Sequence, residues 1–254
     1  MLKKIIHLLK HPSTDYKKIY PFLLITLRKI KQKVNFFERY QIKKNNNFRK
    51  KEYARLAKSY IKNNRIKVHY GCGPRVLKGW INIDLHFVPA EPHLKSYTNE
   101  YYPEAIRGDK NDFFAIDITK TGLPFPDNSV DVIFHEDFIE HLEQKEQILF
   151  LAETFRVLKP NSIHRINTPN LLASMERYSD FKKGVLGVYA GEWNNHGHRN
   201  LFTPNSLDEI AQMIGYNKVL FNSRNKSTSK EIPKEYRPDP IRTEKGNIFA
   251  DLIK

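Results

Sequence analysis

The sequence predicts an α/β fold with a mainly parallel sheet and helices on both of its faces. Short, nearly continuous apolar runs recur after residue 65, separated by turn residues or by segments with helical spacing. Such runs indicate strands that are buried on both sides, which is typical of a parallel sheet covered by helices. The first run ends in a glycine turn and the second at an aspartate, which places polar groups at one edge of the sheet.

Seven segments are predicted to be strands, because each is apolar and lies between turn-forming residues. They are residues 66–70, 80–85, 113–118, 130–136, 162–170, 217–223 and 247–254. The segment 86–112 shows no clear helical pattern. We therefore expect seven strands, with an irregular connection between the second and the third.

Two segments have the apolar spacing of a helix that packs on one face. The first is "KEQILFLAETFRVLK" (145–159), with an expected apolar face of Ile148, Leu151, Ala152, Phe155 and Leu158 and an end at Pro160 and Asn161. The second is "TPNSLDEIAQMIGY" (203–216), with apolar positions at Leu207, Ile210, Ala211 and Ile214, a cap at Asn205 or Ser206 and an end at Gly215. Both helices follow predicted strands, as a layered α/β fold requires.

The charge distribution divides the chain into two predicted parts. Residues 1–63 carry 18 Lys and Arg against 3 Asp and Glu, whereas residues 64–254 carry 25 of each kind, so the net charge of +15 belongs to the first part. Its apolar and basic residues alternate at helical spacing, which predicts a basic amphipathic helical extension. Three roles remain open for it: a solvated arm, a peripheral contact with an anionic membrane through residues 1–35, and a nucleic-acid-binding patch.

Composition also indicates where the protein works. Its single cysteine, Cys72, excludes an internal disulfide framework and fits a reducing compartment. The longest uncharged apolar stretch, about residues 19–27, is far shorter than the ~20 residues that span a bilayer. Lysines interrupt the first ten residues, so they do not form the core of a signal peptide. The expected location is cytoplasmic, with peripheral attachment to the inner face of the membrane as an alternative.

The candidate ligand site follows from the ends of the first three predicted strands. Gly71 and Gly73 follow the first strand, Asp84 ends the second, and Asp117 lies near the end of the third. In parallel sheets ligands bind beyond these carboxyl ends. The glycines allow the backbone to approach a ligand, Asp84 can accept both hydroxyls of a ribose, and Asp117 with the backbone of Ile118 can meet the amino edge of adenine. One adenosine-containing ligand would use all of these groups.

Phosphate-binding motifs are missing from this region. Val76 occupies the third glycine position of a G-x-G-x-x-G fingerprint, and Asp84 follows Gly71 by only 13 residues instead of about 20. The chain contains no G-x-x-x-x-G-K-[ST] sequence either. The expected adenosine ligand therefore carries no phosphate groups.

Three segments carry a family resemblance: "VHYGCGPRVLKGWINIDL" (68–85), "IDITKTGLPFPDNSVDVIFHEDFIEHL" (116–142) and "ETFRVLKPNSIHRINTPNL" (153–171). Together they resemble the class I S-adenosylmethionine-dependent methyltransferases, and more narrowly the compact type 11 group. The resemblance covers roughly residues 65–215 and leaves out the basic extension. It implies a Rossmann-like fold, S-adenosyl-L-methionine as the cofactor, and an enzyme that transfers a methyl group.

The resemblance also implies roles for individual residues. It assigns cofactor binding to Tyr70, Gly71, Cys72, Gly73, Asp84, Asp117, Ile118, His135 and Glu136. His135 is expected to face the sulfonium. The chain has "LKPNS" where the group usually has "LKPGG", and Asn161 can take the left-handed conformation of the missing glycine.

A hydroxyl acceptor would benefit from a nearby base, for which histidine is best suited at neutral pH. The candidates are His135, His141 and His198, with His196 beside the last of them. Glu140 and His141 have an alternative structural role in capping the loop, and His196 and His198 an alternative as a solvated loop. His196-Gly-His198 shows no third ligand nearby, and "HEDFIEH" is not H-E-x-x-H, so no metal is predicted.

Three functions remain open at this point. The first is methyl transfer to a small-molecule or saccharide-type acceptor, which the neutral body favours. The second is methylation of a nucleic acid, such as RNA, held by the basic extension. The third is a membrane-associated binding module of the same fold without catalytic activity.

Overall fold

The computed structural model describes residues 50–59, 65–96, 99–178, 187, 189–235 and 244–254. The chain divides into two compact units, and the second extends from Glu52 to Lys254. Residues 1–49 lie outside the described ranges, so the basic extension, its boundary after residue 63 and its membrane contact through residues 1–35 stay predictions. Within the described ranges, every helix is too short or too polar to cross a lipid bilayer.

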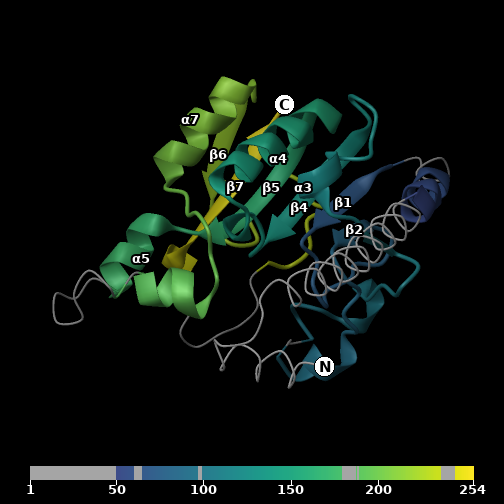
Figure 1. The fold of residues 1–254 in the computed structure, drawn as a ribbon, viewed down its shortest axis with the longest axis horizontal. Helices are drawn as coiled ribbons and strands as arrows, with labels where there is room; N and C mark the ends of the chain where they lie inside the picture. The colour runs from purple at the N-terminus through teal and green to yellow at the C-terminus, as the bar shows by residue number, and fades with distance from the viewer. Residues whose placement is uncertain (1–49, 60–64, 97–98, 179–186, 188, 236–243) are drawn as a thin grey trace, which may run out of the picture. The chain divides into compact units, whose positions relative to one another are not determined.

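A seven-stranded sheet forms the centre of the second unit, in the order β3-β2-β1-β4-β5-β7-β6 (Figure 1). Its strands are β1 (Lys67–Tyr70), β2 (Ile81–Asp84), β3 (Phe113–Ala115), β4 (Val130–Glu136), β5 (Leu158–Pro169), β6 (Lys218–Asn222) and β7 (Asn247–Ile253). The first five strands pair in parallel, and β7 pairs antiparallel with both β5 and β6. The prediction of seven strands in a mainly parallel, Rossmann-like sheet is confirmed.

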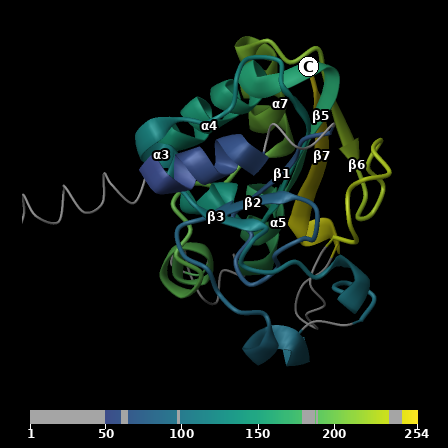
Figure 2. The same ribbon diagram turned by 90° about the vertical axis from the view of Figure 1, so that its right-hand side faces the viewer.

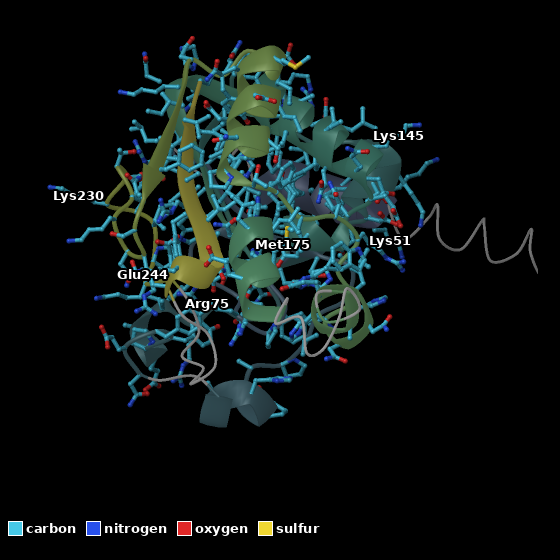
Figure 3. All side chains as sticks on the ribbon, turned by 90° about the vertical axis from the view of Figure 1, so that its left-hand side faces the viewer. Lys51, Arg75, Lys145, Met175, Lys230 and Glu244 are labelled. Carbon is cyan, nitrogen blue, oxygen red and sulfur yellow. The ribbon has the colours of Figure 1, made fainter. Side chains whose placement is uncertain are left out.

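The helices lie mainly on one face of this sheet, where α3, α4 and α7 form a layer (Figure 2). The α-helices are α3 (Ile118–Thr121), α4 (Gln144–Val157), α5 (Leu171–Tyr178), α7 (Pro204–Ile214) and a helix over residues 50–59. Short 3-10 helices are η1 (Glu91–Ser96), η2 (Glu104–Ile106), η3 (Ile139–His141) and η5 (Glu244–Gly246), and η4 (Tyr189–Asn195) is a π-helix. On α5, Met175 is exposed (Figure 3), whereas its neighbour Ser174 is buried.

The two faces of the sheet are covered differently. Alternate strand residues such as Val68, Ile133 and Ile166 pack into one apolar cluster with α4, α7 and Leu56 of the helix over residues 50–59. The other face is covered by the segments that join β1 to β2 and β2 to β3, where the described residues form the 3-10 helices η1 and η2 but no α-helix. This irregular cover agrees with the absence of a helical pattern in residues 86–112.

The buried face of α4 differs from the predicted one. Its buried residues are Gln147, Phe150, Leu151, Thr154 and Val157, whereas the predicted Ile148 is 40% exposed. Two polar side chains can be buried because each is hydrogen-bonded. Gln147 Nε2 donates to the carbonyls of Ile139 and Asn200, and Thr154 Oγ1 donates to that of Leu151. Apolar spacing alone therefore places the buried face about one residue too far along the chain.

Helix α7 starts earlier than predicted. Thr203 is the cap, because its side-chain oxygen accepts a hydrogen bond from the Ser206 backbone N–H, and Pro204 occupies the first turn. Ser206 completes the capping box from inside the helix. The predicted burial of Leu207 and Ala211 and the predicted end at Gly215 are confirmed.

Helix α4 ends at Val157, before the predicted stop, and β5 already begins at Leu158. Asn161 lies within β5 at a left-handed φ of 62°, as predicted for its place in "LKPNS". Its backbone N–H donates to the Lys254 carbonyl at 2.7 Å. The asparagine thus preserves the turn that a glycine would otherwise make.

We expect Asn161→Ala to lower the free energy of unfolding by about 1 kcal/mol, because alanine is strained at positive φ. Asn161→Gly keeps the same hydrogen bond without that strain and should change it by less than about 0.5 kcal/mol. Urea denaturation of the three proteins measures both values. Equal stability of the alanine variant and the wild type would contradict this account.

Candidate functional site

A crevice of about 510 Å³ opens at the carboxyl ends of β1, β2 and β3. It is lined by Tyr70, Gly71, Gly73, Ile83, Asp84, Leu85, Ile116, Asp117, Ile118, Thr119, Asp137, Phe138, His141, Leu142 and Glu146. A cavity of this size falls within the range of small-molecule sites. The glycine turn and the two aspartates that the sequence analysis singled out are therefore brought together.

The glycine turn forms the floor of the crevice. Gly71 has a φ of 59° and its N–H donates to the Ile83 carbonyl at 2.9 Å. A Cβ at Gly71 would lie 2.3 Å from the ring of Phe138, whereas a Cβ at Gly73 would meet no atom within 4 Å. Gly71 is therefore required by packing, and Gly73 leaves open space for a ligand.

Asp84 is held rigidly at the end of β2. Its Oδ2 accepts a hydrogen bond from the Gly73 N–H at 2.8 Å, and its Oδ1 accepts one from the Leu85 N–H at 2.6 Å. Each carboxylate oxygen has a second lone pair, and the side chain lies in the crevice wall. The carboxylate can therefore accept two further hydrogen bonds from a pair of vicinal hydroxyls.

Asp117 occupies the position between β3 and α3. Its Oδ1 accepts from the Thr119 N–H at 3.2 Å and from the Thr119 hydroxyl at 2.6 Å, and its Oδ2 pairs with Lys120 at 2.6 Å. Burial acts to raise the pKa of Asp117, but the hydrogen bonds from Lys120 and Thr119 outweigh it and hold the pKa below its ordinary value. Asp117 is therefore ionised at neutral pH at the edge of the crevice.

Two of the residues expected to bind cofactor do not line the crevice. Cys72 packs in a small apolar cluster with Val76 and Phe113, and burial raises the pKa of its thiol well above the ordinary value. Glu136 forms an ion pair with Arg75 at 2.8 Å and also accepts a hydrogen bond from the Tyr101 hydroxyl. These contacts hold both side chains outside the crevice lining.

His135 is also placed away from the crevice, in contrast to its expected position beside the sulfonium. It lies within β4, is fully buried, and contacts the rings of Phe138, Phe150 and His164. Within the described part of the chain neither of its ring nitrogens has a hydrogen-bond partner. Burial lowers the pKa of His135 to about 3. A neutral ring enclosed in this way cannot reach an acceptor in the crevice.

The other two candidate bases come together at the mouth of the crevice. His141 lines the crevice, and its ring centroid lies 5.0 Å from that of His198. Partial desolvation and the neighbouring His198 lower the pKa of His141, which keeps its ring neutral at pH 7. His198 is buried, and its Nδ1 lies 2.7 Å from Glu192 Oε2. His196, exposed beside it, stacks on His198 at a centroid distance of 5.5 Å.

Sequence analysis missed Asp137 and Phe138, which also line the crevice. Asp137 has a φ of 49°, and its N–H donates to the Asn167 carbonyl at 3.0 Å. Strained backbone of this kind is often found at functional sites. The signal was present in the sequence, because Asp137 directly follows the fourth strand just as Asp84 ends the second.

Three fully buried histidines predict a characteristic loss of stability in acid. Burial is the main cause that lowers the pKa values of His69 and His135 to about 3 and that of His164 well below its ordinary value. Below pH 6.5 the unfolded chain binds protons that the folded chain does not, so the free energy of unfolding falls as the pH falls from 6.5 toward 3. The slope is roughly 1.4 kcal/mol per pH unit for each histidine.

We expect His135→Leu to reduce this slope by about one third between pH 6.5 and 5.5, a window above most carboxyl pKa values. Urea denaturation at several pH values measures the slope. His93→Gln, at a less buried histidine in η1, is the control for removing a histidine outside the buried group. An identical slope for the wild type and His135→Leu would contradict the buried, neutral state of this ring.

Comparisons with known proteins agree with this geometry. Residues 71–166 match the family model described as "Methyltransferase domain", of type 11. A probable S-adenosylmethionine-dependent methyltransferase from Mycolicibacterium smegmatis is 48% identical to this chain over 48 residues. The match covers 19% of this chain and 18% of that relative, less than a fifth of its length.

Similar solved structures include a methyltransferase dependent on S-adenosylmethionine from Archaeoglobus fulgidus. It is 16% identical, with 80% of this chain and 92% of that chain covered and a TM-score of 0.46. Another is a phosphoethanolamine N-methyltransferase from Haemonchus contortus in complex with S-adenosyl-L-methionine. It is 17% identical, with 68% and 38% of the two chains covered and a TM-score of 0.39.

The family match begins at the glycine turn and ends within β5, so it contains every residue that lines the crevice except Tyr70. The sheet order and the antiparallel β7 agree with the fold that the resemblance implies. Residues 71–166 thus match a methyltransferase domain of type 11, which supports the class I S-adenosylmethionine-dependent methyltransferases that the sequence resembles.

Proposed function

We propose that this protein is an enzyme that transfers a methyl group from S-adenosylmethionine to a small-molecule or saccharide-type acceptor. The observation that carries the proposal is the crevice at the ends of β1, β2 and β3, with Asp84 fixed in its wall and open space above Gly73. The family match supports the cofactor. The absence of a phosphate-binding motif fits a cofactor without phosphate groups.

The residues of the crevice fit the parts of this cofactor. Asp84 would accept the ribose hydroxyls, Asp117 and the backbone of Ile118 would meet the adenine, and the turn from Tyr70 to Gly73 would border the methionine part. When bound, the cofactor supplies a methyl group that is already activated by its sulfonium. The chain's main contribution is therefore to align the acceptor and to exclude water from the crevice.

The acceptor would enter from the side of the crevice where polar groups gather. Asp137, His141 and Glu146 line this part of the wall, and the neutral ring of His141 can take a proton or accept a hydrogen bond from a hydroxyl. Groups of this kind suit a polar acceptor such as a sugar or another hydroxyl compound.

Contacts with a membrane or with nucleic acid would involve the basic extension. Their support is the concentration of positive charge in residues 1–63, while residues 64–254 carry balanced charges. Flotation of the full chain with phosphatidylserine vesicles tests the membrane contact, which should weaken steeply with added salt. Binding to vesicles without anionic lipid at the same strength would argue against it.

The proposed function is tested by titrating the full chain with S-adenosylhomocysteine in a calorimeter. One binding site per chain is expected. Absence of heat at two temperatures, for folded protein at about 100 μM, would overturn the proposal, because a binding enthalpy near zero at one temperature differs from zero at the other. Formation of S-adenosylhomocysteine from S-adenosylmethionine in the presence of candidate sugars would then identify the acceptor class.

A further inference from the structure

Three potential metal ligands from distant parts of the chain meet beside the crevice. They are Glu140 and His141 in η3 and His198 in the loop after η4, and their ligand atoms all lie within 4.8 Å of one another. A cation about 2.0–2.2 Å from each atom requires pairwise separations below about 4.4 Å. Rotation of His141, which is exposed, can supply the remaining few tenths of an ångström.

The surrounding hydrogen bonds hold this cluster in a suitable orientation. His198 Nδ1 lies 2.7 Å from Glu192 Oε2, and Glu192 is in turn bonded by the hydroxyl of Ser174 on α5. His198 Nε2 therefore remains on the side of Glu140, 4.0 Å from its Oε1. In many metal sites a carboxylate accepts a hydrogen bond from the ring nitrogen that does not bind the metal. This bond fixes the orientation of the histidine ring and raises its basicity.

Glu140 is anchored from two directions. Its Oε2 accepts a hydrogen bond from the Thr168 hydroxyl at 3.0 Å, and its backbone carbonyl accepts one from the Arg199 N–H at 2.7 Å. The side chain is fully buried, and its Oε1 lies 4.0 Å from His198 Nε2, within the cluster of ligand atoms.

We propose that Glu140, His141 and His198 bind one divalent cation at the mouth of the crevice. Two imidazoles and one carboxylate suit a first-row transition metal such as Zn²⁺, Co²⁺ or Mn²⁺. Three protein ligands leave at least one coordination position free, and His141 places it at the crevice wall. If the proposed function holds, an oxygen of the acceptor occupies this position, where the cation lowers the pKa of its hydroxyl. His141 then acts as a ligand instead of a free base.

The site is tested with the full chain and Co²⁺ or Zn²⁺ alone. Metal-free protein titrated with Co²⁺ should develop visible absorption with one equivalent bound, and calorimetry with Zn²⁺ gives the affinity. His141→Gln and His198→Gln should each weaken Zn²⁺ binding at least 10-fold, and Glu192→Gln should weaken it between 10- and 100-fold by releasing His198. His93→Gln, at a histidine in η1 outside the cluster, is the matched control and should bind as the wild type does.

Because His141 is exposed, His141→Gln should fold even if a variant at a buried position does not. Thermal unfolding without metal checks this. Wild-type Zn²⁺ affinity in folded His141→Gln and His198→Gln would overturn the site and indicate binding elsewhere on the chain. Binding of S-adenosylhomocysteine is measured separately on the same proteins. Cofactor binding without metal binding would refute only the cation site, whereas metal binding without cofactor binding would refute only the methyltransferase function.

Discussion

Asp84→Ala is expected to weaken binding of S-adenosylhomocysteine about 100-fold. The carboxylate at the end of β2 would accept the ribose hydroxyls, and each hydrogen bond to a charged acceptor contributes about 1.5–3 kcal/mol. Alanine also frees the N–H groups of Gly73 and Leu85, which Asp84 holds at 2.8 Å and 2.6 Å. The glycine turn would thus lose its anchor together with the ligand. Calorimetric titration of both proteins with the same ligand measures the loss.

Two further variants separate binding from general damage. Asp84→Asn keeps the size and one acceptor oxygen, so its affinity should lie between those of the wild type and Asp84→Ala. Asp208→Ala changes an aspartate of α7, outside the crevice, and should bind normally. If folded Asp84→Ala bound S-adenosylhomocysteine within a factor of three of the wild type, the ribose would have to lie elsewhere.

Gly71→Ala is expected to have the largest effect on stability, a loss of about 3 kcal/mol in the free energy of unfolding. An alanine at a φ of 59° is strained by about 1–2 kcal/mol, and overpacking in a filled space typically costs 1–3 kcal/mol more. The new Cβ would lie 2.3 Å from Cδ2 and 2.5 Å from Cβ of Phe138, so a rotation of the ring cannot remove the overlap. Urea denaturation measures the loss.

Gly73→Ala provides the matched comparison, because its φ of 50° is similar and its Cβ would meet nothing within 4 Å. We expect Gly73→Ala to lower the free energy of unfolding only by the cost of backbone strain, about 1–2 kcal/mol. It should also weaken cofactor binding, because the new methyl group enters the crevice. Phe138→Ala should recover at least 1 kcal/mol of the Gly71→Ala loss in a double-mutant cycle. Equal losses for Gly71→Ala and Gly73→Ala would show that Phe138 plays no part.

The part of the crevice that we propose to hold ribose and adenine could be predicted from sequence. Strand ends are marked by local signals, and parallel strands bring their carboxyl ends to one edge, so Gly73, Asp84 and Asp117 had to meet there. The acceptor side could not be predicted to the same degree. His135 was expected in the crevice, but it is fully buried against the rings of Phe138 and Phe150, a packing that no local pattern records.

The sequence by itself determined the strands and the placement of Asp84 and Asp117 at the strand ends, because short-range apolar patterns and turn residues encode them. Only the tertiary structure decided that β7 enters the sheet between β5 and β6 and that His198 reaches Glu140 and His141. These features depend on contacts between residues far apart in the chain. Such contacts arise from packing of whole elements, and no local pattern records which distant side chain will complete a cluster.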